Sequence, residues 1–390
     1  MDKMIKFQYL KSVVKKYIYR VMKLLPLKSN IVFECESDMS DNPYVFYQYL
    51  LQQKYNKKHK LIWIVKDVNG CKSLYAEDNV VFITRYPQNF RQQAVLEYYL
   101  STSKWFIFSH PYWFKKYHKD QIVINTTHSV AQLKAPGNMK DQKEIDYILS
   151  CNEYCTEIKK KSFGEFSSYL ELGIPRLDLL YIKDNFDYLN RIPGYTGQNI
   201  ILSLTTFKQS KYMHDSVNAD PYSLNIIKNS SDMNELNQYL MKKNLFLICK
   251  IHHLQRTDVI KAENYSNIVY LTDRDLFEWK IQLNQLLTVA SALLTDYSSA
   301  FYDYLIIDRP IGFMISDKSE YTRGFIKDDV FDLMPGKYIT SLDDLIVFLN
   351  DVISGKDEDS NRRGIERTRV FKYLDGNNCK RLYEWMKLKG

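Results

Sequence analysis

The sequence predicts an α/β protein built from two doubly wound, Rossmann-like domains that face each other across a cleft. Three observations carry this prediction. Short apolar runs alternate with longer stretches of helical periodicity, the runs are continuous, and a segment with one proline and two glycines, residues 186–199, divides them into two sets. Continuous apolar runs of this length are typical of parallel strands covered on both faces. A chain of 390 residues suffices for two domains of ordinary size.

Eleven runs are expected to form strands. The first set consists of Ile31–Cys35, Leu61–Val65, Val80–Thr84, Trp105–Ser109, Ile122–Thr126 and Tyr147–Ser150. The second set consists of Ile200–Leu204, Leu245–Ile251, Ile268–Thr272, Ala292–Thr295 and Pro310–Ile315. We therefore expect a leader over residues 1–29, a first Rossmann-like domain over 30–190, a second over 191–365, and a closing helix over 366–390.

The leader is strongly basic and has helical periodicity. Its apolar residues recur at three- and four-residue spacing, at Leu10, Val13, Val14, Tyr17, Ile18, Val21 and Leu25. Its basic residues fall largely on the other side, at Lys11, Lys15, Lys16, Arg20 and Lys23. Such a helix can lie on an anionic membrane surface, and an amphipathic helix docked on the protein itself is the alternative. The prediction is a membrane-surface helix.

Composition excludes several classes of protein. Apolar residues make up 45% and charged residues 26%, as in globular proteins, and we expect neither a membrane span nor a signal peptide. Most of the net charge of +8 lies in the first 30 residues, whereas a nucleic-acid binder would spread basic residues over its folded body. The six cysteines lack a metal-binding pattern and are expected to be free thiols.

Polar residues follow four of the expected strands, where ligands bind in open parallel sheets. His128 and Lys134 follow one strand, and Thr205, Thr206 and Lys208 follow another. The remaining two sets are Lys250, His252 and His253, and Thr295 to Ser299. Four polar strand ends together favour a ligand site, although each alone has an ordinary structural explanation. Adjacent histidines on an extended segment point to opposite faces, so His252 and His253 are not expected to share a metal.

The segment "TDYSS" ends a strand and begins a helix. Ser298 or Ser299 can cap that helix, whose free N–H groups and dipole would bind phosphate. Asp296 would repel an adjacent phosphate, so it is expected to orient the loop or to contact a sugar hydroxyl. The alternative is a helix cap with no ligand.

Several segments resemble the CDP-glycerol glycerophosphotransferases of teichoic acid and capsule synthesis. "LTDYSSAFYDYLIIDRPIGF" is similar to the family signature, "LGIPRLDLL" to its Gly-x-Pro-Arg-x-Asp segment, and "DNPYVFYQYL" to its Asn-Pro segment. "HSVAQLK" corresponds to the His-Gly segment and "KIHH" to the Lys-x-His-Pro segment, while "YTRGF" and "YLDGNNCKRL" match near the end. The resemblance covers almost the whole chain from about residue 30, in the same order.

This resemblance implies a GT-B-like fold and transfer of a polyol phosphate from a CDP-polyol to a hydroxyl, with release of CMP. Carried over by position, His128 is the general base and His252 contacts the pyrophosphate. The substrate-binding residues implied are Thr206, Lys250, Asp296, Ser298, Ser299, Lys134 and Arg309, the last with a structural role as its alternative. Two positions depart from the family: Ser129 replaces a glycine, and His253 replaces a common proline.

The resulting hypothesis is a phosphotransferase held peripherally at the cytoplasmic face of the membrane, acting in teichoic acid or capsule synthesis. Its expected partners are CDP-glycerol or CDP-ribitol, a lipid-linked saccharide or polymer acceptor, and an anionic membrane, with no nucleic acid. A nucleotide-sugar glycosyltransferase of GT-B fold and a non-catalytic scaffold are the alternatives. The sequence leaves open glycerol against ribitol, primer addition against polymer extension, and a requirement for Mg²⁺, since no carboxylate cluster marks a site.

Overall fold

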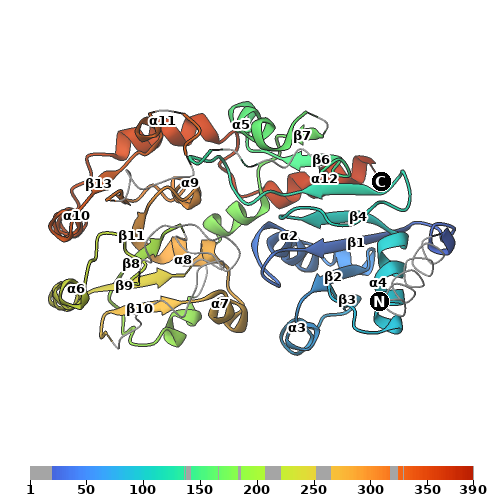
Figure 1. Cartoon of the computed structure of the whole chain (residues 1–390), viewed down its shortest axis with the longest axis horizontal. Coiled ribbons are helices and arrows are strands. Elements are labelled where there is room, and N and C mark those ends of the chain that lie inside the picture. The colour runs from blue at the N-terminus through green and yellow to red at the C-terminus, as the bar shows by residue number, and fades with distance from the viewer. Residues whose placement is uncertain are drawn as a thin grey trace, which may run out of the picture.

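The protein consists of two α/β domains that lie side by side, each built on a parallel sheet (Figure 1). The structure is a computed structural model, and it describes residues 20–135, 137, 142–165, 167–182, 186–206, 221–251, 265–316, 324–327 and 329–389. The predicted α/β class with two doubly wound domains is therefore confirmed.

The first sheet has seven strands in the order β3-β2-β1-β4-β5-β6-β7, and every pairing is parallel. The strands are β1 (Lys28–Glu34), β2 (Leu61–Val65), β3 (Val80–Thr84), β4 (Ser103–Phe108), β5 (Ile122–Asn125), β6 (Tyr147–Leu149) and β7 (Ser168–Leu170). Helices connect them: α2 (Asp41–Gln52), α3 (Val68–Tyr75), α4 (Phe90–Thr102) and α5 (Glu153–Phe163). The short 3₁₀ segments are η1 (Tyr55–Lys57), η2 (Pro175–Tyr181) and η3 (Asp187–Arg191).

The second sheet has six parallel strands in the order β10-β9-β8-β11-β12-β13. They are β8 (Asn199–Leu204), β9 (Leu245–Lys250), β10 (Ile268–Leu271), β11 (Ala290–Thr295), β12 (Ile311–Met314) and β13 (Lys337–Ile339). Its helices are α6 (Ser230–Lys242), α7 (Asp273–Trp279), α8 (Leu283–Val289), α9 (Ala300–Tyr304), α10 (Leu342–Ser354) and α11 (Ser360–Val370), with the 3₁₀ segment η6 (Val330–Leu333).

The continuous apolar runs form strands because both faces of each sheet are covered. All five residues of β2 and all six of β9 are buried. The eleven expected strands are all present; two have the expected bounds, and the ends of the others shift by up to three residues. The expected set lacked β7 and β13, which have three residues each and lie at sheet edges. Three residues are too few to give a periodic signal.

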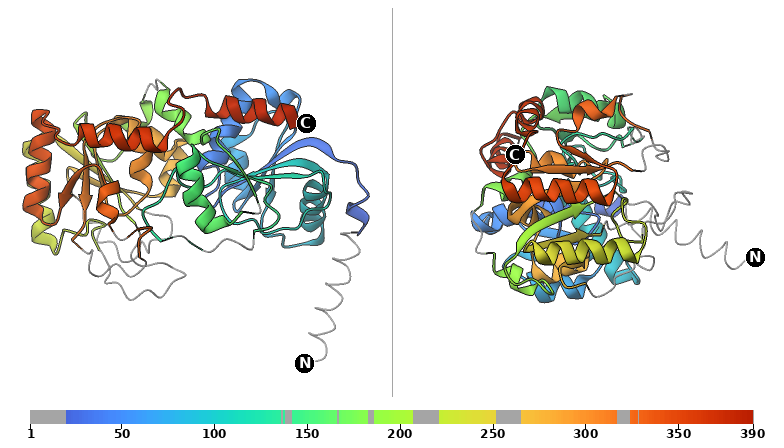
Figure 2. Two further views of the ribbon diagram at one scale, coloured as in Figure 1. Left: turned by 90° about the horizontal axis from the view of Figure 1, so that it is seen from above. Right: turned by 90° about the vertical axis from the view of Figure 1, so that its left-hand side faces the viewer.

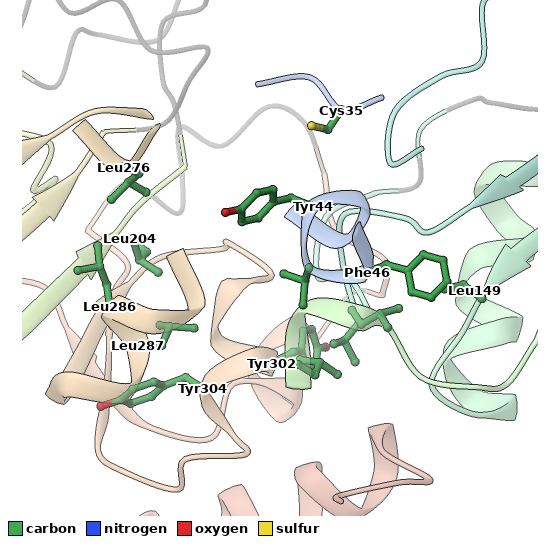
Figure 3. Close-up of a cluster of buried hydrophobic side chains, with 14 of the residues drawn as sticks. Cys35, Tyr44, Phe46, Leu149, Leu204, Leu276, Leu286, Leu287, Tyr302 and Tyr304 are labelled. Carbon is green, nitrogen blue, oxygen red and sulfur yellow. The ribbon is translucent and has the colours of Figure 1, made fainter. Parts of the chain in front are cut away.

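The largest apolar core runs through both domains. It joins Phe46 and Leu149 of the first domain to Leu204, Leu286 and others of the second (Figure 3). Hydrogen bonds also cross the interface: the Tyr75 hydroxyl donates to the Phe277 carbonyl oxygen at 2.7 Å. A large apolar interface restricts relative domain motion. The loops at the carboxyl ends of the two sheets are therefore held against each other.

The last helix, α12 (Asn378–Lys389), returns to the first domain (Figure 2). The Trp385 ring lies 6.4 Å from the ring of Trp105 and 4.6 Å from that of Tyr147, centre to centre. The chain thus crosses between the domains twice, and the final helix closes onto the first sheet.

Most of the basic leader lies outside the described residues, so the predicted amphipathic helix stays a prediction. The described part begins at Arg20, and Met22 packs against the apolar core around Val32. Among the helices that the structure describes, none is long and apolar enough to cross a membrane.

Candidate active site at the carboxyl ends of the strands

The loop after β5 presents His128 to solvent. Thr127 has a positive φ of 58°, and its N–H donates to the Asn125 side-chain oxygen at 2.7 Å. The Asn42 amide of α2 donates to the Thr127 carbonyl oxygen at 2.8 Å, which fixes the turn from the other side. The side chain of His128 is 53% exposed at this turn. A histidine held by a rigid turn and open to solvent can meet a substrate.

Asp41, at the start of α2, orients this histidine. Its Oδ2 lies 3.0 Å from Nδ1 of His128, and its Oδ1 accepts from Nη1 of Arg176 at 2.9 Å. Burial alone would raise the pKa of Asp41, but the charges and hydrogen bonds of Arg176 and His128 hold it below the usual range. An ionised Asp41 favours the His128 tautomer with its proton on Nδ1. Nε2 can then accept a proton.

Arg176 connects this pair to the second domain. Its guanidinium forms a two-pronged ion pair with Asp303 of α9, at 2.7 and 3.1 Å, and donates to the His128 carbonyl oxygen at 2.6 Å. The Asn284 amide also donates to Asp303, at 3.0 Å. The arginine is only 8% exposed, so these contacts take place away from bulk water. One buried side chain therefore fixes the histidine loop relative to the helix that follows Ser299.

The chain around Arg176 is held by the C-terminal segment. The carboxylate of Asp178 accepts the backbone N–H groups of Asn378 and Cys379 at the start of α12, each at 2.8 Å. Gly173 has a φ of +80°, and a Cβ there would lie 1.9 Å from the Asn378 side-chain oxygen. The "LGIPRLDLL" and "YLDGNNCKRL" segments thus pack together, and glycine is needed where they meet.

In the second domain, Asp296 organises the loop after β11. Its carboxylate accepts the backbone N–H and the hydroxyl of Thr206, at 2.9 and 2.7 Å, and the backbone N–H of Ser298 at 3.0 Å. Asp296 is 1% exposed. The geometry supports the expected role in orienting the loop, and it brings Thr206 and Ser298 together at adjacent strand ends.

The two serines differ in their use as caps. Ser298 Oγ accepts the Ala300 N–H at 3.4 Å, whereas Ser299 is the N-cap residue and makes no side-chain cap bond. The helix α9 has only five residues, so its dipole is smaller than the sequence suggested. The hydroxyls are thus the main feature of this strand end, and their contact with substrate stays a prediction.

Lys250 ends β9 and is paired with Asp273 of the same domain. Its ammonium group lies 2.5 Å from Oδ1 of Asp273, and the Ser37 hydroxyl of the first domain donates to the other oxygen of Asp273 at 2.5 Å. The lysine side chain is 7% exposed. In this arrangement the charge of Lys250 is offset by a carboxylate, and Asp273 joins the strand end of the second domain to the loop after β1.

Lys134 and Arg309 lie in different surroundings. Lys134 forms an antiparallel bridge with Phe325, which ties the segment after His128 to the "YTRGF" region.

Arg309 donates to the carbonyl oxygens of Thr288 and Ala290, at 2.9 and 2.7 Å. These carbonyls are at the amino end of β11, opposite to Ser298. The structure does not bring Arg309 to the site, and its contacts correspond to the structural alternative.

Some predicted residues fall outside the described part of the chain, among them His252, His253 and Lys208. Within the described residues, no group of three or more histidine, cysteine, aspartate or glutamate side chains is arranged to hold a metal ion. Sequence reasoning gave no role to Asp41, Arg176 and Asp303. The first two lie in the quoted "DNPYVFYQYL" and "LGIPRLDLL" segments and the third in "LTDYSSAFYDYL", so the resemblance could have indicated them.

Two parallel-sheet Rossmann-like domains with joined strand ends define a GT-B-like fold. The chain belongs to the CDP-glycerol:poly(glycerophosphate) glycerophosphotransferase family, whose model matches residues 17–387. The predicted family, enzyme class and reaction class, polyol-phosphate transfer in teichoic acid synthesis, are therefore confirmed. The family assignment favours phosphotransfer over the alternative of a sugar transferase.

Individual relatives agree with the assignment. The chain is 27% identical over 388 residues to a teichoic acid glycerol-phosphate transferase of Staphylococcus aureus, covering 93% of each chain. It is 25% identical over 356 residues to a teichoic acid poly(glycerol phosphate) polymerase of Bacillus spizizenii, covering 83% of this chain and 84% of the other. The solved structure of the wall teichoic acid polymerase TagF matches its fold with a TM-score of 0.75, at 20% identity, covering 98% of this chain and 96% of that one.

Proposed function

We propose that the protein transfers glycerol phosphate from CDP-glycerol to a hydroxyl of a lipid-linked or polymer acceptor, with His128 as the general base. The observation that carries this assignment is the pair formed by His128 and Asp41, 3.0 Å apart, with the imidazole open to solvent. An oriented, neutral imidazole is suited to removing a proton near pH 7. Asp41 acts through His128 and is a positioning residue.

The transfer is a displacement at the phosphorus atom that carries the polyol. As the acceptor oxygen attacks, its proton passes to Nε2 of His128. The bond between this phosphorus and the bridging oxygen breaks, and CMP leaves with the electron pair. Arg176 holds Asp41 ionised, so the imidazolium that forms is stabilised by a neighbouring carboxylate.

The donor would lie at the strand ends of the second domain. Ser298 and Ser299 supply hydroxyls to the diphosphate, and Thr206 lies beside them, because Asp296 holds both Thr206 and the backbone of Ser298. Hydroxyl and N–H donors can offset charge that develops on the transferred group without adding a fixed charge. In this arrangement His252 contacts the pyrophosphate, and Lys250 and Lys134 support the loops around it.

Two finer points belong to the same proposal. CDP-ribitol is a second donor to test. The basic leader would hold the protein on the anionic cytoplasmic face of the membrane, close to a lipid-linked acceptor. Deletion of residues 1–25 should lower pelleting with anionic vesicles, and unchanged pelleting would exclude this role of the leader.

The test of the base is His128→Ala, measured as CMP release from CDP-glycerol in the presence of acceptor. We expect turnover to be abolished while CDP-glycerol still raises the melting temperature, by the shift that corresponds to about 2.7 kcal/mol at 100 times its Kd. His59→Ala is the matched control, because His59 contacts Ser29 and Tyr383 at the amino end of the first sheet. CMP release by the His128 variant at the wild-type rate would falsify the base assignment.

A further inference from the structure

A second group of polar and aromatic side chains lies at the carboxyl ends of the strands of the first sheet, the same end of the sheet as His128. Glu34 ends β1, Arg85 follows β3, and His110 and Trp113 follow β4. Strands β1, β4 and β5 are neighbours in the sheet. Since adjacent strands are about 4.8 Å apart, the end of β1 lies roughly 10 Å from the end of β5, which carries His128. We refer to Glu34, Arg85, Tyr86, His110 and Trp113 as the β1 edge cluster.

Two aromatic rings of this cluster are exposed and held in place. Trp113 is 40% exposed, yet its indole N–H donates to Oε2 of Glu34 at 2.6 Å. Arg85 lies 6.0 Å from the Trp113 ring centre and 5.8 Å from that of Tyr86, which is 55% exposed. Nε of Arg85 is 3.1 Å from Oε1 of Glu34. An indole anchored from beneath offers a fixed apolar face to solvent.

Polar atoms beneath these rings have no hydrogen-bond partner among the residues that the structure describes. They are Nε2 of His110 and the hydroxyl of Ser109, in side chains that are 3% and 1% exposed. His110 Nε2 lies 3.7 Å from Oε2 of Glu34, beyond hydrogen-bond distance. Buried polar groups left unpaired are costly. A ligand hydroxyl that reaches the carboxyl ends of β1 and β4 can pair with them.

The charges around the cluster select a neutral ligand. Arg85 and Lys66 are already paired with Glu34 and Glu36, at 3.1 and 3.0 Å. The carboxylate of Asp38 accepts the backbone N–H of Lys66 at the same edge. The two cations, Arg85 and Lys66, face three carboxyl groups, those of Glu34, Glu36 and Asp38. No excess of positive charge is therefore left to bind a polyanionic chain of polyol phosphates. Hydroxyl groups, by contrast, donate well to carboxylates, and sugar rings stack on indole.

We propose that the β1 edge cluster binds a neutral saccharide of the acceptor, stacked on Trp113 with its hydroxyls directed to Glu34 and His110. This inference rests on the proposed function, because it requires His128 to act on the acceptor. A saccharide about 10 Å from the base places the reactive hydroxyl on, or directly beside, a sugar ring. The reaction is then addition to a saccharide primer, and a polyol-phosphate chain is not the preferred acceptor.

Saturation-transfer NMR on the full-length protein, without donor, tests the binding. The probes are methyl glycosides of a neutral and of an N-acetylated disaccharide, compared with a synthetic glycerol phosphate trimer. We expect a disaccharide to bind and the trimer to bind more weakly. Trp113→Ala should weaken disaccharide binding about tenfold, which corresponds to about 1.4 kcal/mol. Trp113→Phe keeps a ring and should retain most of the binding.

Tyr338→Ala is the matched control, because Tyr338 is an exposed aromatic residue on β13 of the other domain. In turnover assays with a saccharide acceptor, the Trp113→Ala loss should fall on the acceptor KM rather than on kcat. Binding of the trimer alone, or disaccharide binding that Trp113→Ala does not change, overturns the inference. Because the NMR measurement needs no turnover, a failure of the general-base proposal would be seen separately, in the His128 assay.

Discussion

Two carboxylates near the carboxyl end of β1, Glu34 of that strand and Asp41 of the helix that follows it, have opposite surroundings. Asp41 is held between Arg176 and His128, so its pKa lies below the usual range although burial opposes this. For Glu34, burial outweighs the charge of Arg85 and the hydrogen bond from Trp113, and its pKa rises to about 7. The residues are seven positions apart in the sequence and face the same edge of the sheet.

The difference comes from the charges around each carboxylate. Asp41 lies between Arg176 and His128, which both favour its ionised form, whereas Glu34 has Arg85 as its cation and the like charges of Glu36 and Asp38 nearby, which oppose ionisation. A fixed negative charge suits a residue that must position His128. A carboxyl group that gains or loses its proton near pH 7 suits the binding of hydroxyls.

The largest expected effect comes from removing the charge that keeps Asp41 ionised. Arg176→Met leaves the carboxylates of Asp41 and Asp303 without their cation, so we expect a loss of about 3–5 kcal/mol in the free energy of unfolding. Urea denaturation measures it. The control is Arg274→Ala, which breaks an exposed pair with Glu278 and should leave the free energy of unfolding nearly unchanged. Equal losses in the two variants would contradict the difference between the networks.

The raised pKa of Glu34 should make the free energy of unfolding fall as pH rises. A paired carboxylate with a lowered pKa has the opposite effect. The unfolded chain loses this proton near its usual pKa of 4.5, while the folded protein keeps it until about pH 7. Between these values the folded state binds more protons, so stability falls as pH rises. At pH 8, a shift of about 2.5 pKa units lowers the free energy of unfolding by up to about 3 kcal/mol.

Glu34→Gln isolates this contribution, because glutamine can still accept from Trp113. Glu366 also has its pKa raised to about 7 by burial, so only the difference between variant and wild type is informative. We expect the variant to be more stable at pH 8 and the difference to disappear below about pH 4.5, as measured by urea denaturation at several pH values. A difference that grows toward low pH would mean that Glu34 is stabilised in its ionised form.

Asp41→Asn tests the catalytic side of the comparison. The amide can keep a contact to Nδ1 of His128 but no longer selects the tautomer or stabilises the imidazolium. We expect kcat to fall about 100-fold, or about 2.7 kcal/mol in the activation free energy, with little change in the KM for CDP-glycerol. Steady-state kinetics of CMP release measures both. A change confined to KM would instead assign Asp41 to substrate binding.

The sequence predicted the fold more completely than the site. Continuous apolar runs such as Leu61–Val65 depend only on burial on both faces, and they form strands as expected. His128 and Ser298 could be selected because they follow strands directly. Asp296 was expected to orient its loop, and its contacts with Thr206 support that role.

The missing part of the site depends on contacts between distant segments. Arg176 joins Asp41, 135 positions away, to Asp303, 127 positions away, and no local pattern marks such a pairing. Arg309 is the opposite case: it belongs to a matching motif, but its guanidinium lies on carbonyls at the far end of β11. A motif identifies a conserved type of contact, and the fold decides whether that contact reaches the substrate.

The smallest expected effect concerns the loop that carries His128. The resemblance places a glycine at the position of Ser129, but the positive φ in this turn belongs to Thr127, and Ser129 is not among the described residues with that geometry. Serine therefore needs no unusual backbone conformation here. Ser129→Gly should lower stability by roughly 0.5–1 kcal/mol, because glycine gains freedom in the unfolded chain. If kcat in CMP-release assays rises more than about tenfold, the serine side chain obstructs the acceptor. If kcat is unchanged, the turn set by Thr127 and Asn42 presents the base, and the residue after the histidine does not matter for it.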